Sequence, residues 1–198
     1  MNPIDIRKQL RQARNNLSDC QQSQNASLAF QHFKNFIETH SDFQTPQKIA
    51  LFLAQDSELA TEQCINYLWL NTQHQVFLPV LETKPEWHMA FAEYHQHSPM
   101  KKNQFKIDEP EMSHHLHLSG QQMDWVIMPL VGFDKQGNRL GMGGGYYDRT
   151  FAFKQQQSEQ HTQLIGWAHS CQQVEKLPTQ DWDVPLDAVL TEMGLQEF

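Results

Sequence analysis

The chain is poor in cysteine, in long apolar runs and in positive charge, and each scarcity excludes a class of protein. Its three cysteines, Cys20, Cys64 and Cys171, lie far apart and form no Cys-x-x-Cys pair. This favours a reducing compartment and argues against a disulfide framework or a zinc knuckle. No stretch approaches the ~20 apolar residues that cross a bilayer, and the N-terminus lacks the apolar core of a signal peptide. We therefore expect a cytoplasmic protein with no membrane partner.

Positive charge is in the minority, because 15 lysines and arginines face 23 aspartates and glutamates, for a net charge of −8. This balance argues against a nucleic-acid partner, although a local basic cluster can still bind a small anionic ligand. The hydrophobic fraction of 39% is low but still globular. We expect residues 1–198 to form a single domain with a substantial core, as a monomer or weak dimer.

Glycine is also scarce, but five of the nine glycines fall between Gly137 and Gly145. Glycines let the backbone bend and approach a ligand, and successive N–H groups that lead into a helix form a cradle for anions. The stretch Arg139–Arg149 (RLGMGGGYYDR) adds arginines on both sides and a carboxylate. These groups suit a nucleotide polyphosphate and its divalent metal ion, so the stretch predicts an ATP-binding loop.

Two common phosphate motifs are missing from this stretch. A Walker loop needs Gly-Lys-Ser/Thr, and the chain contains no Gly-Lys pair; a Rossmann pattern needs a third glycine where Tyr146 stands. A flexible linker is the alternative interpretation. The charged flanks and the preceding apolar run favour binding, because Trp125–Phe133 predicts a strand buried on both faces. Tyr146–Phe153 predicts a helix directly after the loop.

Helical and strand patterns alternate along the rest of the chain. A capping residue and a proline begin a first helix, whose apolar side is formed by Ile6, Leu10, Ala13 and Leu17. The other expected elements are a helix over Ser23–Thr39 with Leu28, Phe33, Phe36 and Ile37 inward, a helix over Thr61–Leu70, and strands over Ile49–Ala54, Val76–Leu81, Met89–Tyr94 (antiparallel), Gln163–His169 and Ala188–Thr191. Residues 95–122 are polar and stay unassigned. The alternation predicts an α/β fold: a mostly parallel open sheet flanked by helices on both faces, Rossmann-like and three-layered, with ligands at the carboxyl ends of the strands.

Arg7, Arg11 and Arg14 recur at spacings of four and three residues and share a face of the first helix. From spacing alone, a solvated basic face is the simpler interpretation. Three aspartates between the last two strands, Asp181, Asp183 and Asp187, are also ambiguous. Their segment either is a surface loop or brings a second carboxylate to a magnesium ion held near Asp148.

Two further clusters are weak candidates. The densest histidine cluster is His114, His115 and His117, but no glutamate or cysteine completes a metal motif there. Cys171 lies two residues from His169, yet free cysteines are commonly just buried. We expect neither cluster to carry the chemistry.

In their order and spacing, these segments resemble the 5-formyltetrahydrofolate cyclo-ligase family over essentially the whole chain. The matching segments are Arg7–Arg11, Leu53–Thr61 with Glu58 in a Glu-x-x-Thr setting, Pro129–Arg149, Gln172, Leu177-Pro178 and Asp183–Asp187. The glycine loop is the specific piece, and the others gain weight from their arrangement. The resemblance implies small-molecule substrates, ATP and 5-formyltetrahydrofolate, and closure of the latter to 5,10-methenyltetrahydrofolate with release of ADP and phosphate. The formyl oxygen would be phosphorylated, and N10 would then attack the formyl carbon.

The resemblance also implies roles for individual residues. ATP would be bound by Arg7, Lys8, Gln9, Leu10 and Arg11, and by Arg139, Leu140, Gly141, Met142, Gly143, Gly144, Gly145, Tyr146 and Tyr147. The folate would be bound by Leu53, Glu58, Met142, Gly143, Gly144, Gly145 and Tyr146, with Glu58 on the pterin. Catalytic or orienting roles would fall to Arg139, Tyr147, Arg149 and Gln172, and the Mg²⁺ ligands would be Asp148 and Asp183.

The chain departs from the family pattern at two positions of this set. Many relatives carry lysine where this chain has Gly144, so the remaining arginines would carry more of the phosphate charge. Arg7 replaces a common lysine, which keeps the charge but changes its geometry. Two alternatives stay open: a non-catalytic folate or nucleotide binder on the same scaffold, and a sugar-phosphate or coenzyme A enzyme with a similar sheet.

Overall fold

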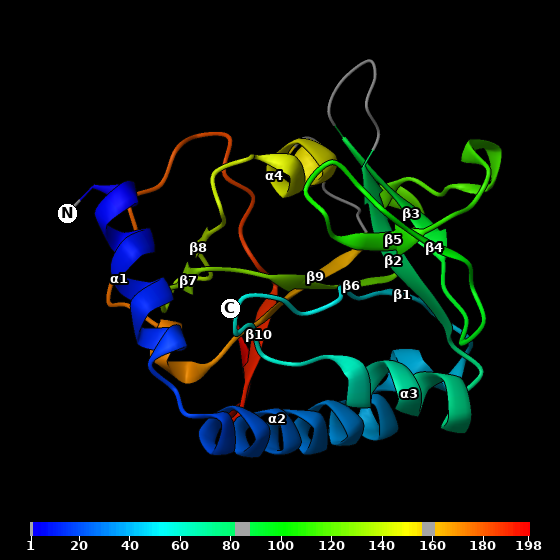
Figure 1. Cartoon of the computed structure of the whole chain (residues 1–198), viewed down its shortest axis with the longest axis horizontal. Helices are drawn as coiled ribbons and strands as arrows, with labels where there is room; N and C mark the ends of the chain where they lie inside the picture. Colours follow the sequence, from blue (N-terminus) through cyan, green and yellow to red (C-terminus); the bar gives the residue numbers. More distant parts are fainter. Residues whose placement is uncertain (1, 82–87, 156–160) are drawn as a thin grey trace.

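The computed structural model describes residues 2–81, 88–155 and 161–198. Seven strands form one sheet in the order β11-β10-β9-β6-β1-β2-β3 (Figure 1). Their bounds are β1 Lys48–Ala50, β2 Gln75–Leu81, β3 Met89–Glu93, β6 Trp125–Pro129, β9 Gln163–Trp167, β10 Ala188–Thr191 and β11 Gly194–Glu197. The five inner strands are parallel, and the edge strands β3 and β11 are antiparallel to their neighbours. The mostly parallel sheet and the antiparallel Met89 strand are thus confirmed.

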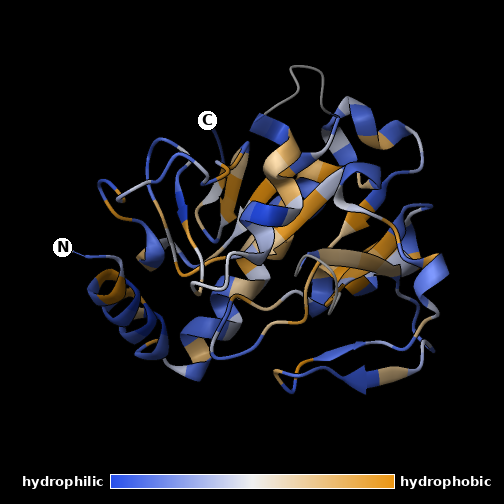
Figure 2. Ribbon diagram, turned by 90° about the horizontal axis from the view of Figure 1, so that it is seen from above, coloured by the Kyte–Doolittle hydropathy of each residue, from blue (hydrophilic) through white to orange (hydrophobic). Residues whose placement is uncertain are grey.

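Helices and short turns cover both faces of this sheet, which confirms the three-layer α/β fold. On one face lie α2 (Asp19–Thr39) and α3 (Glu62–Asn71), where buried Phe33 meets Trp167 edge to face. On the other face lies the short α4 (Tyr146–Phe151), followed by the 3-10 turn η4 (Ala152–Gln155). Figure 2 shows the apolar strands enclosed between these layers, with hydrophilic segments outside. Among the described residues, no helix is long and apolar enough to span a membrane.

The second helix differs from its predicted form. It begins at Asp19, four residues earlier than expected, because Ser18 forms a capping box with Gln21. Leu28 is exposed rather than inward. The buried stripe instead runs through alanines and aromatics: Ala26, Ala29, Phe33, Phe36 and Ile37. The small alanine side chains let the helix approach the sheet closely. Hydrophobicity alone did not show that the alanine side of the helix, rather than the side with Leu28, faces the sheet.

The apolar run Trp125–Phe133 is not one strand. It divides into β6 of the main sheet and β7 (Gly132–Phe133), which pairs with β8 (Arg139–Leu140) in a separate hairpin. The first helix, α1 (Pro3–Asn15), packs on this hairpin, and a Cβ on Gly132 would collide with the Leu10 side chain. The glycine loop therefore follows the hairpin and not a strand of the sheet, with α1 beside it (Figure 1).

Strand Ile49–Ala54 was predicted too long, since β1 ends at Ala50. The polar segment 95–122 contains a second hairpin, β4 (Met100–Lys102) with β5 (Asp108–Pro110), and the 3-10 turns η2 (His114–Leu116) and η3 (Gly120–Gln122). A further 3-10 turn, η5 (Ser170–Gln172), follows β9, and η1 (Ser41–Gln44) follows α2. Short strands with few apolar residues leave little periodicity to detect.

Asp134, at the turn of the β7–β8 hairpin, gives the first testable prediction. It is fully buried, and its carboxylate accepts hydrogen bonds from the backbone N–H groups of Gln136, Asn138 and Leu177 and from the Asn138 amide. Burial acts to raise the pKa of Asp134, but these hydrogen bonds outweigh it and hold the pKa below 3.8. A carboxyl with a lowered pKa contributes stability above its unfolded pKa, and this is lost as pH falls.

We expect Asp134→Asn to reduce the free energy of unfolding by about 2–3 kcal/mol near neutral pH, because the new amide donor would face existing donors. Urea denaturation at neutral and at acidic pH would measure this loss, which should shrink as pH falls below the carboxyl's unfolded pKa. A variant as stable as the parent at neutral pH would show that the turn does not depend on this carboxylate.

Candidate active site

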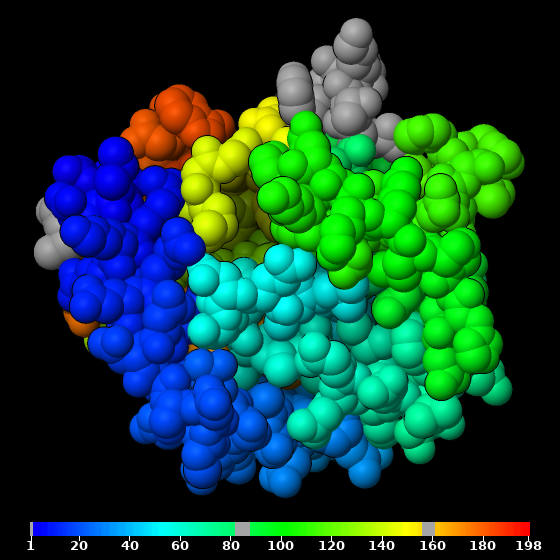
Figure 3. Space-filling view, viewed as in Figure 1, coloured from blue at the N-terminus to red at the C-terminus, as the bar shows by residue number. Residues whose placement is uncertain are grey.

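The candidate site lies where the strand order of the sheet reverses. From β1 the chain continues through α3 to β2 on one side, whereas β6 lies on the other side of β1. Ligands of open α/β sheets bind at such a reversal, outside the carboxyl ends of the strands. The segment after β1, the hairpin after β6, the glycine loop and α1 all meet there. Figure 3 shows a hollow between α1 (blue), the segment after β1 (cyan), the glycine loop (yellow) and the β4–β5 hairpin (green).

Two arginines donate hydrogen bonds to carbonyl groups of the glycine loop. Arg7 on α1 donates from Nε to the Gly141 carbonyl at 2.7 Å, and Arg149 donates from Nη2 to the Gly144 carbonyl at 2.9 Å. Gly145, with φ +65°, caps α4, and a Cβ there would lie 2.7 Å from the Arg149 guanidinium. The positive φ favours glycine at this cap, and the loop backbone lies close to the Arg149 guanidinium.

Arg139 gathers the two predicted metal ligands. Its side chain is 5% exposed, and Nη2 lies 2.8 Å from Oδ1 of Asp148. Burial lowers the pKa of Arg139, while the charges of Asp148, Tyr147 and Asp183 act to raise it. Asp183 is therefore close enough to interact with the same guanidinium, although it comes from a different loop. The structure brings these residues, predicted from distant segments, around one point.

The donor set around Arg139 fits a magnesium ion. Carboxylate oxygens are hard donors, and Mg²⁺ in proteins is usually held by one or two of them together with phosphate oxygens and water. In the parts of the chain that the structure describes, no group of three or more His, Cys, Asp or Glu side chains is arranged to hold a metal by itself. Asp148 and Asp183 would therefore supply the protein's share, and a bound triphosphate the remainder.

The N-terminal helix presents only part of its predicted ATP-binding set. A hollow of about 660 Å³ is lined by Ile4, Arg7, Lys8, Arg11, Gln12, Asn15 and Met142. Gln9 is exposed outside this lining. Leu10 and, on β8, Leu140 are buried in a small core with Ile6, Val131 and Leu177. Both leucine side chains therefore hold α1 against the hairpin, and contact of these two residues with ATP stays a prediction.

Arg14 does not share the exposed basic face. Its side chain is 1% exposed, and its guanidinium lies 3.1 Å from Asp56 and 3.9 Å from Glu58. Arg11 also binds Asp56, through Nη2 at 2.6 Å and Nε at 3.2 Å. The helical spacing was correct, but the partners that allow burial lie more than forty residues away in sequence.

Glu58, the predicted pterin ligand, is partly buried beside the glycine loop. Its side chain is 19% exposed, and Oε2 accepts a hydrogen bond from the Gln55 N–H at 3.0 Å. Burial raises the pKa of Glu58. Burial also raises the pKa of Tyr147, with a further increase from the charge of Glu58. Leu53, half-buried in the same segment, packs on the main core.

Gln172 is buried in a hydrogen-bond network, and its orienting role stays a prediction. Its buried amide donates to the carbonyls of Leu130 and Val131 and accepts from the His169 N–H. It thereby joins η5 to the end of β6. Burial raises the pKa of the neighbouring Cys171 thiol, which disfavours a nucleophilic thiolate. The rings of His114 and His117 meet edge to face with their centroids 5.1 Å apart, and among the described residues no group of three or more His, Cys, Asp or Glu side chains could hold a metal ion.

The β4–β5 hairpin is the part of the site that the sequence did not reveal. Its tip brings Gln104 within 3.4 Å of the Tyr146 hydroxyl and sets the Phe105 ring edge to face with the Tyr146 ring, at 6.1 Å between centroids. Phe105 is 55% exposed. An exposed aromatic beside the glycine loop offers a stacking surface for a flat ligand. In the sequence, the only indication of this contact was an apolar residue, Phe105, in an otherwise polar turn.

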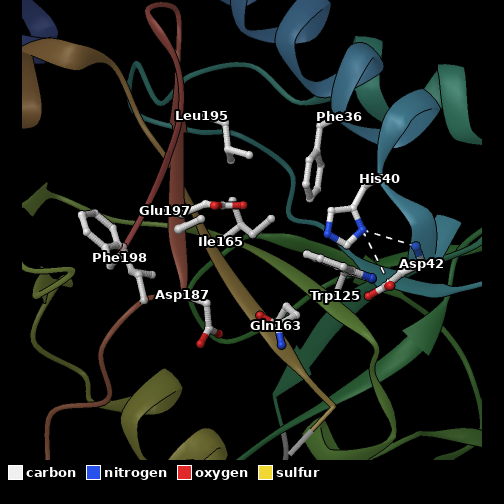
Figure 4. A pocket seen from close by; sticks show the side chains of 12 residues that line it. Phe36, His40, Asp42, Trp125, Gln163, Ile165, Asp187, Leu195, Glu197 and Phe198 are labelled. Atoms are coloured by element: carbon white, nitrogen blue, oxygen red, sulfur yellow. Dashed lines mark hydrogen bonds and ion pairs between the residues drawn. The ribbon is translucent and has the colours of Figure 1, made fainter.

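A second hollow, of about 420 Å³, lies at the opposite edge of the sheet, near the amino ends of β6, β9 and β10. Figure 4 shows aromatic rings from Phe36 and Trp125 beside the His40–Asp42 contact, with Asp187 and Glu197 on the other wall. No residue predicted to bind ATP, folate or metal lines it. The candidate site is therefore the hollow at the carboxyl edge.

The chain is similar to proteins of one family over most of its length. The model of the 5-formyltetrahydrofolate cyclo-ligase family matches residues 3–192. A 5-formyltetrahydrofolate cyclo-ligase of Haemophilus influenzae is 42% identical over 187 residues, covering 93% of this chain and 95% of the relative. One of Escherichia coli K12 is 44% identical over 152 residues, covering 76% and 80%. The NMR structure of Aquifex aeolicus 5,10-methenyltetrahydrofolate synthetase aligns with a TM-score of 0.77 at 25% identity, covering 100% of this chain and 93% of that one.

Proposed function

The chain belongs to the 5-formyltetrahydrofolate cyclo-ligase family, and from this we propose that it uses ATP to close 5-formyltetrahydrofolate into 5,10-methenyltetrahydrofolate, releasing ADP and phosphate. One observation supports the assignment of the site. The groups that we propose to bind phosphate (Arg7, the glycine loop and Arg139) converge with Glu58 at one edge of the sheet. We further propose that the protein acts in the cytoplasm on these small molecules, without nucleic acid, as a monomer or weak dimer.

The chemistry explains why a nucleotide and a folate must share one site. The oxygen of a formyl amide is a poor leaving group, so N10 cannot expel it unaided. Transfer of the γ-phosphoryl group to that oxygen forms a P–O bond and releases ADP. N10 then attacks the formyl carbon, the C–O bond breaks, and the oxygen leaves with phosphate. Such a transfer depends on positioning and charge stabilisation more than on covalent catalysis.

We assign the phosphate charge to three arginines. Arg7 and Arg11 reach the triphosphate from α1, and Arg139 lies beneath it at the base of the loop. Loop amides from Gly141 to Tyr147 surround the phosphates, as the positive φ of Gly143 and Gly145 supports. Arg149 keeps the loop in shape through the Gly144 carbonyl. Many relatives carry lysine at the position of Gly144. Because glycine offers no side-chain cation there, we assign that charge to the arginines.

Asp148 and Asp183 would hold Mg²⁺, which when bound neutralises part of the phosphate charge. The protein's own contribution is to bring both carboxylates beside Arg139, whose cation offsets their mutual repulsion. The Val184 N–H additionally donates to Asp148 at 3.3 Å and helps to orient its oxygens.

On the folate side, we propose that Glu58 accepts hydrogen bonds from the pterin amino and ring N–H groups. Its partial burial supports this role, because a carboxylate bond to two donors is strong away from water. Leu53 and the middle of the loop, from Met142 to Tyr146, would border the pterin and the formyl group. Tyr147, half-buried next to Glu58, would orient the reacting atoms. Phe105 adds an aromatic surface at the entrance.

A turnover assay tests the proposal directly. Protein, 5-formyltetrahydrofolate, ATP and magnesium are mixed, and the absorbance of the methenyl product is followed together with ADP. We expect product only with ATP, at one ADP per methenyl group. Tight folate binding without turnover would support a non-catalytic binder, and absence of both would refute the folate assignment.

Glu58→Gln separates the two substrates. The variant keeps the size of the side chain but loses the charge, so we expect the KM for folate to rise about tenfold or more, while the KM for ATP changes less than about threefold. Glu62→Gln, an exposed glutamate in the first turn of α3, is the matched control and should leave both constants unchanged. An unaltered folate KM in Glu58→Gln would remove Glu58 from the pterin site.

A further inference from the structure

A buried cation lies behind the proposed folate-binding carboxylate. Arg14 is the only arginine of α1 that is fully buried, and its Nη atoms point to Asp56 and Glu58 at 3.1 and 3.9 Å. A buried charge is costly unless it is paired, so these contacts are what permits an arginine at this place. Both partners belong to the four-residue turn Gln55–Glu58 that follows β1.

The turn itself has an unusual backbone. Asp56 and Ser57 both have positive φ, +49° and +60°, in a region that residues with a side chain rarely adopt. The turn is closed by the Glu58 N–H on the Gln55 carbonyl at 2.8 Å and by the Gln55 N–H on the Glu58 carboxylate. It is attached to α1 by Arg11 and Arg14, which both bind Oδ2 of Asp56. The direction of Glu58 therefore depends on α1 as well as on its own loop.

We propose that Arg14 is a positioning residue for the reaction: it holds the turn Gln55–Glu58 against α1 and keeps Glu58 ionised and directed at the folate, with Asp56 as the opposing charge. This inference rests on the proposed function, since it gives Glu58 the pterin. Arg14 itself, behind the turn, touches no substrate. It differs in this from Arg11, which faces the hollow.

The charges around Glu58 have opposing effects on its pKa, so variants of these charged residues should differ in a measurable way. Burial is the largest influence and raises the pKa of Glu58, the charges of Arg14 and Arg11 lower it, and the charge of Asp56 raises it. From α4, Tyr147 faces the same carboxylate. Removing Arg14 should therefore favour protonated Glu58, and removing the charge of Asp56 should favour ionised Glu58. If Arg14 and Asp56 acted only through packing, their substitutions would not shift the pKa of Glu58 in opposite directions.

The experiment measures the dissociation constant of 5-formyltetrahydrofolate by calorimetry across the pH range in which binding weakens on acidification. The proteins are the parent, Arg14→Met, Arg14→Lys and Asp56→Asn. For Arg14→Met we expect about tenfold weaker binding near neutral pH and a midpoint moved to higher pH. Arg14→Lys restores the charge and should stay within about threefold of the parent. Asp56→Asn should move the midpoint to lower pH, because it removes the negative charge that raises the pKa of Glu58. The turn should keep its shape, since asparagine tolerates the left-handed backbone.

Titration of the folate itself is common to all four proteins and cancels in the comparison. Equal midpoints in the parent and in Arg14→Met, with a uniform loss of affinity, would overturn the inference. If Arg14→Met does not fold, Asp56→Asn decides: a midpoint that stays in place or moves upward overturns it. Failure of the proposed function is seen separately, as the absence of ATP-dependent methenyl formation by the parent, and does not change the sign of these binding shifts.

Discussion

Replacing Asp148 with asparagine should lower kcat by about 100-fold or more while the protein stays folded. The substitution keeps an oxygen that can accept from the Val184 N–H, but it removes the charge that faces Arg139 at 2.8 Å. The side chain of Asp148 is 22% exposed, so water and the nearby Asp183 can partly compensate the buried guanidinium. We expect a stability loss of about 1–2 kcal/mol, measured by thermal unfolding beside steady-state turnover.

The loop Gln180–Asp183 provides a matched pair for this test. Asp183→Asn should resemble Asp148→Asn in turnover, whereas Asp181→Asn, an exposed aspartate two residues away, should behave as the parent. Equal effects at 181 and 183 would indicate a general charge effect of the loop, and normal turnover in Asp148→Asn would remove Asp148 from the metal site.

The second large effect is expected at Arg139. Its side chain is 5% exposed, at the base of the glycine loop, and it pairs with Asp148. Arg139→Met fills a similar volume but removes the cation beneath the phosphates, so we expect kcat/KM for ATP to fall by about 100- to 1,000-fold. Folate binding in the absence of nucleotide should change less than about threefold.

Lys135→Met is the control for this variant. Lys135 lies in the turn of the same β7–β8 hairpin, but its ammonium group pairs with Glu175 on the surface. Its loss should leave kcat/KM unchanged. If Arg139→Met weakened folate and ATP equally, the guanidinium would be supporting the whole pocket and not the phosphates in particular.

The fold was predictable where burial and periodicity coincide. The strands at Val76, Met89, Gln163 and Ala188 were identified by apolar runs, and they lie in the sheet as expected. Trp125–Phe133 was misjudged because its apolar residues continue past the sheet. Val131 is buried in a separate small core, formed by α1, the β7–β8 hairpin and Leu177, rather than within the main sheet. A hydrophobic sequence shows that a residue is buried but not which element buries it.

The grouping of the candidate site residues was predictable where they are local in sequence. The glycine loop with Arg139 and Asp148 forms a continuous stretch, and the structure keeps it together. Arg14 and Phe105 could not be assigned, because their partners, Asp56, Glu58 and Tyr146, are remote in sequence. A buried arginine and a solvated one have the same helical spacing, and only the folded chain distinguishes them.

We propose that the site converts the formyl oxygen into a leaving phosphate. The most direct measurement uses 5-formyltetrahydrofolate whose formyl group carries a heavy oxygen isotope, in a single turnover with unlabelled ATP. Mass spectrometry of the products should find the label in inorganic phosphate, one atom per methenyl group formed. Label released into water, with phosphate unlabelled, would contradict the account.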